Sequence, residues 1–167
     1  PAITHQSMHA ADALVCLHDL VHEVIPAACR GKLHVIHQSA PPLSRPRAPS
    51  RRTFDICVIG HLREEKDPLR AALAARAMPA SSRLRIIHLG KAHDDAWAEK
   101  ARREMAANPR YRWRGEVPGW VVRREFVKTQ AMVLSSVMEG GANVISEAVV
   151  AGVPVIASDI HGSVGLL

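Results

Sequence analysis

Two glutamates on either side of a glycine pair form the most unusual group of residues in this sequence. Glu139 comes directly before Gly140 and Gly141, and Glu147 follows inside a segment with helical character. The glycines would let the chain turn tightly with its N–H groups exposed, and the start of a helix adds a partial positive charge. We therefore expect the turn to hold an anion, with Asn143 as the residue that caps the helix.

The two carboxylates allow two interpretations. Glu147 could accept hydrogen bonds from the two hydroxyls of a ribose, and Glu139 could face a sugar or a developing positive charge. Alternatively, Glu139 belongs to an ordinary turn and Glu147 is exposed to solvent. The apolar residues around Glu147 predict a helix that is nearly all buried. Because a buried carboxylate needs a partner, that prediction weighs against the second interpretation.

A second group of polar residues follows the apolar run that ends at Gly60. His61, Arg63 and Lys66 come after it, ahead of an expected helix. Cations and free backbone N–H groups in one place suit a phosphate or a pyrophosphate. The two cations could equally pair with the acidic residues of the same turn, and the sequence leaves both possibilities open.

A third loop contains Glu116 and Val117 between Gly115 and Pro118. Its backbone could hydrogen-bond the edge of a nucleobase, but an ordinary loop between a strand and a helix fits these residues as well. The two turns could hold a ribose and a phosphate, and this loop could hold a base. These are the parts of a nucleotide.

The ten histidines raise the question of a metal ion. The pairs His5/His9 and His18/His22 have the spacing that places two imidazoles on one face of a helix. No clustered cysteines or carboxylates complete either pair. We therefore expect no metal site and no cofactor.

These loops must be positioned by strands and helices that alternate along the chain. Strands are expected at residues 54–60, 84–90, 111–115, 131–136 and 153–159. Helices are expected at residues 65–78, 94–108, 119–130 and 143–152, the first of them capped by Asp67. This alternation predicts an α/β fold with a Rossmann-like, doubly wound parallel sheet. Ligands bind such sheets at the carboxyl ends of the strands, where all three loops begin.

The first part of the chain has a different character. Residues 13–17 and 33–37 are expected to be strands, with one helix between them that ends near Gly31. We predict that residues 1–40 are the tail of a preceding domain, 41–52 a linker rich in proline and arginine, and 53–167 the main domain, incomplete at its C-terminus.

The positive charge of the chain is local. The formal charge is +6, and the linker arginines Arg45, Arg47, Arg51 and Arg52 supply four of the positive charges. No aromatic residues alternate with them, which weighs against binding of nucleic acid by base stacking. The odd count of three cysteines, without a CxxC motif or a signal peptide, predicts reduced thiols and a cytoplasmic location. No apolar run is long enough to span a membrane.

Three stretches, GHLREEKDP, RWRGEVP and SSVMEGGANVISEAVVAGVPVIASDIHG, resemble the C-terminal domain of group 1 glycosyltransferases, which are retaining enzymes of the GT-B fold. The last stretch matches a family pattern of two glutamates separated by seven residues. The resemblance covers about residues 54–165. Residues 1–38 resemble the end of the acceptor-side domain, so the missing part of that domain is an expected partner.

The resemblance implies a nucleotide-sugar donor, UDP-linked, that is bound without a metal ion. It assigns the diphosphate to Lys66, the donor sugar to Glu139 and the ribose hydroxyls to Glu147. It also implies phosphate contacts at Gly141, Ala142 and Asn143. Contacts with the base are implied at Glu116 and Val117. The acceptor is not identified, and the fragment alone is expected to be inactive.

Two positions depart from the family pattern. His61 stands where the family usually has an arginine, and we expect Arg63 to take over that role. The turn EGGAN replaces the more common Glu-Gly-Phe-Gly. This difference bears on which sugar is bound and not on the binding of the anion. The stretches GHLREEKDP and MEGGAN are also similar to selenosugar synthases, which join a UDP-N-acetylhexosamine to selenophosphate.

Other functions fit the same residues. The chain could belong to a different GT-B enzyme, such as a nucleotide-sugar epimerase or a phosphorylase. It could also be a non-enzymatic module that binds a nucleotide, or nucleic acid through the arginine linker.

Overall fold

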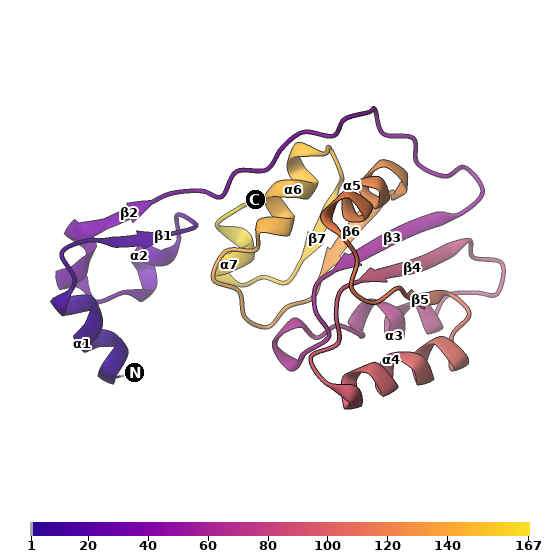
Figure 1. Cartoon of the computed structure of the whole chain (residues 1–167), viewed down its shortest axis with the longest axis horizontal. Coiled ribbons are helices and arrows are strands. Elements are labelled where there is room, and N and C mark those ends of the chain that lie inside the picture. Colours follow the sequence, from indigo (N-terminus) through magenta and orange to yellow (C-terminus); the bar gives the residue numbers. More distant parts are fainter. Residues whose placement is uncertain (1) are drawn as a thin grey trace.

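The computed structural model describes residues 2–167 and contains two parallel sheets. The small sheet pairs β1 (Leu14–Cys16) with β2 (Leu33–Val35). The large sheet consists of β3 (Phe54–Ile59), β4 (Leu84–Leu89), β5 (Tyr111–Trp113), β6 (Ala131–Leu134) and β7 (Val155–Ala157). Its order is β5-β4-β3-β6-β7, and every neighbouring pair is parallel (Figure 1). The predicted α/β fold with a doubly wound parallel sheet is confirmed.

Helices cover both faces of the large sheet. The helices α3 (Arg70–Arg76) and α4 (Asp95–Ala107) lie on one face, and α5 (Gly119–Lys128) and α6 (Asn143–Val150) lie on the other (Figure 1). The remaining helical segments are α1 (Ala2–Ala10), α2 (Val21–Val24), α7 (His161–Val164) and the 3₁₀ helices η1 (Ala27–Lys32) and η2 (Glu64–Lys66). None of the helices in residues 2–167 combines the length and apolar character of a membrane-spanning helix.

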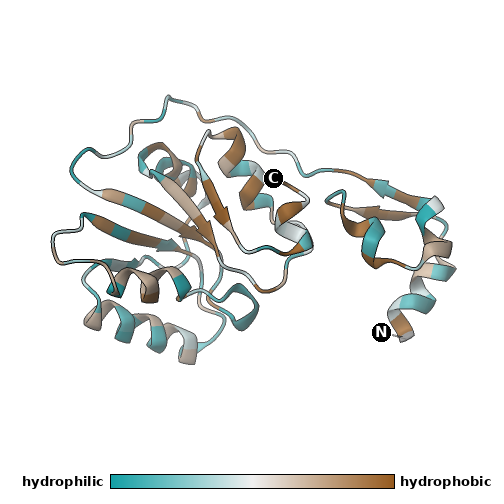
Figure 2. Ribbon diagram, turned by 180° about the vertical axis from the view of Figure 1, so that it is seen from behind, coloured by the Kyte–Doolittle hydropathy of each residue, from teal (hydrophilic) through white to brown (hydrophobic). Residues whose placement is uncertain are grey.

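The core has two halves because neighbouring residues of a strand point to opposite faces of the sheet. On β3, Cys57 packs with Phe126 of α5 and Ile145 of α6, whereas Val58 packs with Ala72 of α3. Figure 2 shows hydrophobic residues along the central strands and along α6. Both faces of β3 are therefore covered, as its continuous apolar sequence requires.

The strand order creates one position where the chain changes direction. From β3 the chain moves outward to β4 and β5, and it then returns to the other side of β3 to form β6 and β7. The loops that leave β3 and β6 therefore separate to opposite faces of the sheet. In open α/β sheets the crevice at this point is the usual place for a ligand.

Two predicted helices begin or continue differently in the structure. The single helix expected up to Gly31 is wrong, because Pro26 separates α2 from η1. The helix expected from residue 65 begins only at Arg70. Asp67 is not its N-cap: it has a left-handed backbone with φ 39° and ends η2. A residue before a proline is disfavoured in the right-handed helical region, which explains the break.

Three further local differences concern helices. The sequence pattern did not predict α1. The helix α6 is not nearly all buried, since Val149 is 53% and Val150 47% exposed. Asn143 is the first residue of α6 and not its N-cap, a position that Ala142 occupies.

The N-terminal unit, residues 2–38 with α1, β1, α2, η1 and β2, lies against the turns at one end of the large sheet. A Cβ atom built on Gly141 would lie 2.6 Å from Cβ of Leu17, and one on Gly165 would lie 2.6 Å from Nδ1 of His18. His161 of α7 also pairs with Glu23 at 3.3 Å. The division into a preceding domain, a linker and a main domain stays a prediction.

Candidate functional site

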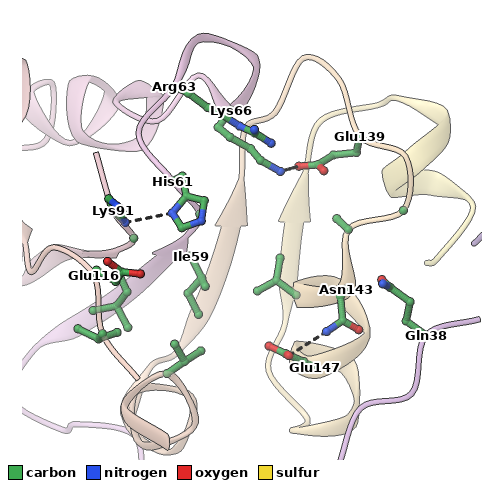
Figure 3. A pocket seen from close by; sticks show the side chains of 18 residues that line it. Gln38, Ile59, His61, Arg63, Lys66, Lys91, Glu116, Glu139, Asn143 and Glu147 are labelled. Carbon is green, nitrogen blue, oxygen red and sulfur yellow. Dashed lines mark hydrogen bonds and ion pairs between the residues drawn. The ribbon is translucent and has the colours of Figure 1, made fainter. Parts of the chain in front are cut away.

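A cavity of about 460 Å³ opens at the carboxyl ends of the strands of the large sheet. Its lining comes from the loops after β3, β4 and β5, from the turn after β6 and from the start of α6 (Figure 3). Of the site residues predicted from the sequence, only Gly140 does not line this cavity. The predicted residues that do line it are Gly60, His61, Arg63, Lys66, Glu116, Val117, Glu139, Gly141, Ala142, Asn143 and Glu147.

At one end of the cavity Lys66 donates a hydrogen bond to Oε1 of Glu139 and forms an ion pair with it (Figure 3). Ser136 donates to the same oxygen at 2.6 Å. The Lys66 side chain is 18% exposed and that of Glu139 is 8% exposed. Each charge therefore keeps a partner in a partly desolvated place, which a lone buried charge could not tolerate.

Two hydrogen bonds hold the loop after β3 against the turn after β6. The N–H of Val137 donates to the carbonyl of Glu65 at 2.8 Å, and the hydroxyl of Ser135 donates to the carbonyl of Asp67 at 2.8 Å. These contacts place η2 over the end of β6. As a result Lys66 reaches Glu139, although the two residues are far apart in the sequence.

A buried histidine beneath the cavity fixes the backbone at Gly60. Nε2 of His88 lies 3.0 Å from the Gly60 carbonyl, and Nδ1 lies 3.0 Å from the Tyr111 hydroxyl. Burial lowers the pKa of His88 to about 4, so the ring is neutral at pH 7. Because a carbonyl only accepts, Nε2 carries the proton and Tyr111 donates to Nδ1. Gly90 lies so close that an added Cβ would be 1.9 Å from the Gly60 oxygen.

On the α6 side of the cavity Glu147 accepts a hydrogen bond from Nδ2 of Asn143 at 3.0 Å. Partial burial raises the pKa of the Glu147 carboxyl, and the nearby charge of Arg123 lowers it to a smaller extent. Oδ1 of Asn143 is buried and has no hydrogen-bond partner among residues 2–167. This side of the cavity thus has acceptors that a ligand with hydroxyl donors could satisfy.

The opposite side of the cavity carries Glu116 (Figure 3), and Val117, the next residue of the same loop, also belongs to the lining. Gly115, with φ 71°, accepts a hydrogen bond from the N–H of Gly90 at 2.9 Å, which ties the loop after β5 to the loop after β4. Ile59 of β3 and Val144 of α6 supply apolar surface between the two sides. A flat ring could rest on such a surface with its polar edge toward a loop backbone.

Seven residues of the lining did not emerge from the sequence analysis: Gln38, Ile59, Leu89, Gly90, Lys91, Val122 and Val144. Leu89, Gly90 and Lys91 had a usable signal, because they follow a strand that ends in glycine as Gly60 does. Gln38 had none, since only packing brings the N-terminal unit to this edge. Within residues 2–167 no three metal-binding side chains gather at one place.

The cavity combines a cationic group beside an acidic one at one end, hydrogen-bond acceptors on α6 and the apolar side chains of Ile59 and Val144. The N-terminus of α6 adds free N–H groups and a partial positive charge at its edge. This set can bind an elongated ligand that has an anionic centre, a diol and a flat ring.

Comparison with known proteins agrees with this description. Residues 53–166 match the family described as glycosyl transferases group 1. A search of curated proteins found no match.

Several solved structures share the fold. HepE of Anabaena in complex with UDP and glucose has a TM-score of 0.74 and 15% identity, covering 98% of this chain and 51% of its own. The apo form of the lipopolysaccharide outer core galactosyltransferase WaaB has a TM-score of 0.64 and 22% identity. The match covers 89% of this chain and 43% of the WaaB chain. The pneumococcal O-GlcNAc transferase GtfA in complex with UDP and GlcNAc has a TM-score of 0.65 and 18% identity. The match covers 95% of this chain and 32% of the GtfA chain. The chain therefore spans about half the length of HepE.

Proposed function

Because the chain belongs to the group 1 glycosyltransferase family, we propose that it supplies the donor site of an enzyme that transfers a sugar from a UDP-sugar to an acceptor. One observation carries the proposal: Lys66 and Glu147, from two distant segments, line one cavity at the point where the strand order reverses. HepE and GtfA were solved with UDP, which supports uridine as the nucleoside.

The geometry supports one orientation of the donor. Glu116 and Val117 would contact the base, and Glu147 would accept hydrogen bonds from the ribose diol. The diphosphate would lie at the N-terminus of α6, near Gly141 and Lys66, as anions do at such helix ends. The transferred sugar would then lie beside Glu139.

This orientation gives each charge a role in donor cleavage. Breaking the bond between the sugar and the diphosphate leaves negative charge on the phosphate and positive charge on the sugar. Lys66 and Arg63 would stabilise the first, and Glu139 the second. The ion pair between Lys66 and Glu139 supports this proposal, because it holds a cation and a carboxylate side by side. Retention of configuration and independence from metal ions are part of the proposal, on the basis of the sequence resemblance.

A second small cavity, of about 170 Å³, supports an anionic acceptor. A parallel bridge joins Leu62 to Ala92, and Leu62 is fully buried. The residues on either side of this bridge line the cavity together with Ala92. They form a cationic and imidazole-rich group, His61, Arg63, Lys91 and His93. Selenophosphate, the acceptor of selenosugar synthases, has the required charge.

Titration calorimetry tests the donor site. The chain should bind UDP in the presence of EDTA, and Glu147→Ala should weaken binding about tenfold or more, since hydrogen bonds to a charged group contribute about 1.5–3 kcal/mol. Glu99→Ala, an exposed change on α4, is the matched control. A folded protein that binds none of UDP, GDP and ADP would contradict the proposal.

Phosphate binding to the UDP-saturated chain tests the acceptor class. We expect inorganic phosphate to bind, and His93→Ala to weaken that binding while leaving the UDP affinity within a factor of two, because His93 lines this cavity and not the donor cavity. Phosphate that competes with UDP instead would show that the basic group serves the donor.

The reaction type is tested with the full-length enzyme and donor. A sugar joined to the acceptor with the donor's anomeric configuration supports retaining transfer. A changed donor sugar would indicate an epimerase, and a sugar phosphate formed reversibly from an oligosaccharide would indicate a phosphorylase. A cytoplasmic location also remains part of the proposal.

A further inference from the structure

Gln38 lines the donor cavity although it follows β2 of the small sheet and lies outside the large sheet and its helices. Figure 3 shows it on the side of Asn143, away from Glu116. The structure gives its side chain no hydrogen bond within residues 2–167, and the residue is exposed. Its amide is therefore available to a ligand at the end of the cavity opposite the base-binding loop.

The two residues directly before Gln38 contact the N-terminal unit. The N–H of Ile36 donates to the carbonyl of Cys16 at 2.9 Å, and His37 lies 3.5 Å from a carboxylate oxygen of Asp19. The same unit packs against the glycine turn, where Leu17 meets Gly141. Gln38 thus has a defined position relative to the turn that carries Glu139.

The chemistry of the side chain selects the part of the donor that it can recognise. A primary amide is neutral and offers both donors and an acceptor, which suits a sugar hydroxyl. A phosphate group, which only accepts hydrogen bonds when ionised, is better matched by Lys66 and Arg63. The unpaired Oδ1 of Asn143 is a second acceptor on this side of the cavity.

We propose that Gln38 binds a hydroxyl group of the transferred sugar and so contributes to the choice of donor sugar. The assignment rests on the proposed function, because it needs a nucleotide-sugar in the cavity. It makes the N-terminal unit part of the donor site and not only of the acceptor side.

Calorimetry with UDP, UDP-glucose, UDP-galactose and UDP-N-acetylglucosamine tests this assignment. The contribution of the sugar is the ratio of the Kd for UDP to the Kd for the tightest UDP-sugar. Loss of one hydrogen bond should lower that ratio about three- to tenfold in Gln38→Ala while the Kd for UDP stays the same. Gln6→Ala, an exposed change on α1, should alter neither value.

Two results would overturn the assignment and leave the donor site intact. One is an unchanged ratio in Gln38→Ala, and the other is an equal loss of UDP and UDP-sugar affinity. Failure of the unaltered protein to bind UDP would instead contradict the proposed function, and the assignment would fall with it. An NMR measurement on the unaltered protein does not depend on whether a variant folds. The signal of the Gln38 side-chain amide should shift when a UDP-sugar is added and should not shift when UDP is added.

Discussion

At the residue scale, Glu147 shows how a residue of the proposed binding site can lower the stability of the fold. Its carboxyl is partly buried, and its hydrogen bond from Asn143 does not prevent a raised pKa. A raised pKa in the folded state means that the ionised form destabilises the fold relative to the protonated form. The site thus keeps a carboxylate that is better satisfied when a ligand donates to it.

The first prediction concerns Glu147→Gln. The stabilising effect of the protonated carboxyl is present below the unfolded pKa of about 4.3 and is lost as the pH rises through the higher folded pKa. The variant should therefore have a higher Tm than the unaltered protein at pH 7, with the difference vanishing toward pH 4, and a weaker affinity for UDP. Thermal melts across this pH range and calorimetry at pH 7 measure both. A variant that is less stable at pH 7 would contradict the prediction.

The second prediction concerns Lys66→Ala. Removal of the ammonium group would take away the proposed phosphate contact and leave the Glu139 carboxylate with less compensation. UDP affinity should fall about tenfold, whereas uridine, which has no phosphate, should bind as before. Calorimetry with both ligands measures the contrast, and Lys100→Ala on α4 is the control. An equal loss for uridine would show a general distortion of the cavity.

At the scale of elements, the site depends on contacts between loops more than on any one helix. His88 of β4 holds the carbonyl of Gly60 after β3, and Gly90 leaves room for it. The turn after β6 meets the N-terminal unit at Gly141, which has φ 131°. The two glycines of this turn are therefore not equivalent, since an added Cβ at Gly140 would meet nothing within 4 Å.

The third prediction compares these two glycines. Gly141→Ala would force a side chain into a backbone conformation that disfavours it and against Leu17, at a cost of about 1–3 kcal/mol. Gly140→Ala should change stability by less than about 0.5 kcal/mol, as surface changes usually do. Urea unfolding of both variants measures the difference. Equal effects at the two positions would show that the close contact at Gly141 is not needed.

At the scale of the whole molecule, the predicted arginine-rich linker contacts the chain just after α5 and just after α6. Arg47 donates hydrogen bonds to the carbonyls of Gly152 and Thr129, the latter at 2.7 Å. Arg45 is exposed. The linker arginines are thus divided between a structural contact and solvent, which weakens the alternative of one continuous nucleic-acid-binding patch.

The fourth prediction separates these two arginines. Arg47→Ala removes two hydrogen bonds to backbone carbonyls and should destabilise the protein by about 1–3 kcal/mol, at about 0.5–1.5 kcal/mol for each bond. Arg45→Ala should have almost no effect. Urea unfolding is the measurement, and retention of both variants on nucleic acid at low salt tests the alternative function. Strong retention that is lost in Arg45→Ala would favour that alternative.

The sequence by itself determined the fold class and much of the cavity, because both depend on local patterns. Short apolar runs placed the strands, and the residues that follow the strand ends pointed to Gly60, Lys66 and Glu147. The prediction was wrong where a proline interrupts a helical pattern. The helix breaks at Pro26, and Asp67, which precedes Pro68, ends η2 and does not start a helix.

Only the tertiary structure decided which of these residues meet. The ion pair between Lys66 and Glu139, the support of Gly60 by His88 and the presence of Gln38 in the cavity all join segments that are distant in the sequence. Such contacts follow from the strand order and from how the N-terminal unit packs against the glycine turn. Neither leaves a local pattern, since hydrophobic periodicity reports whether a side chain is buried but not which side chain lies next to it.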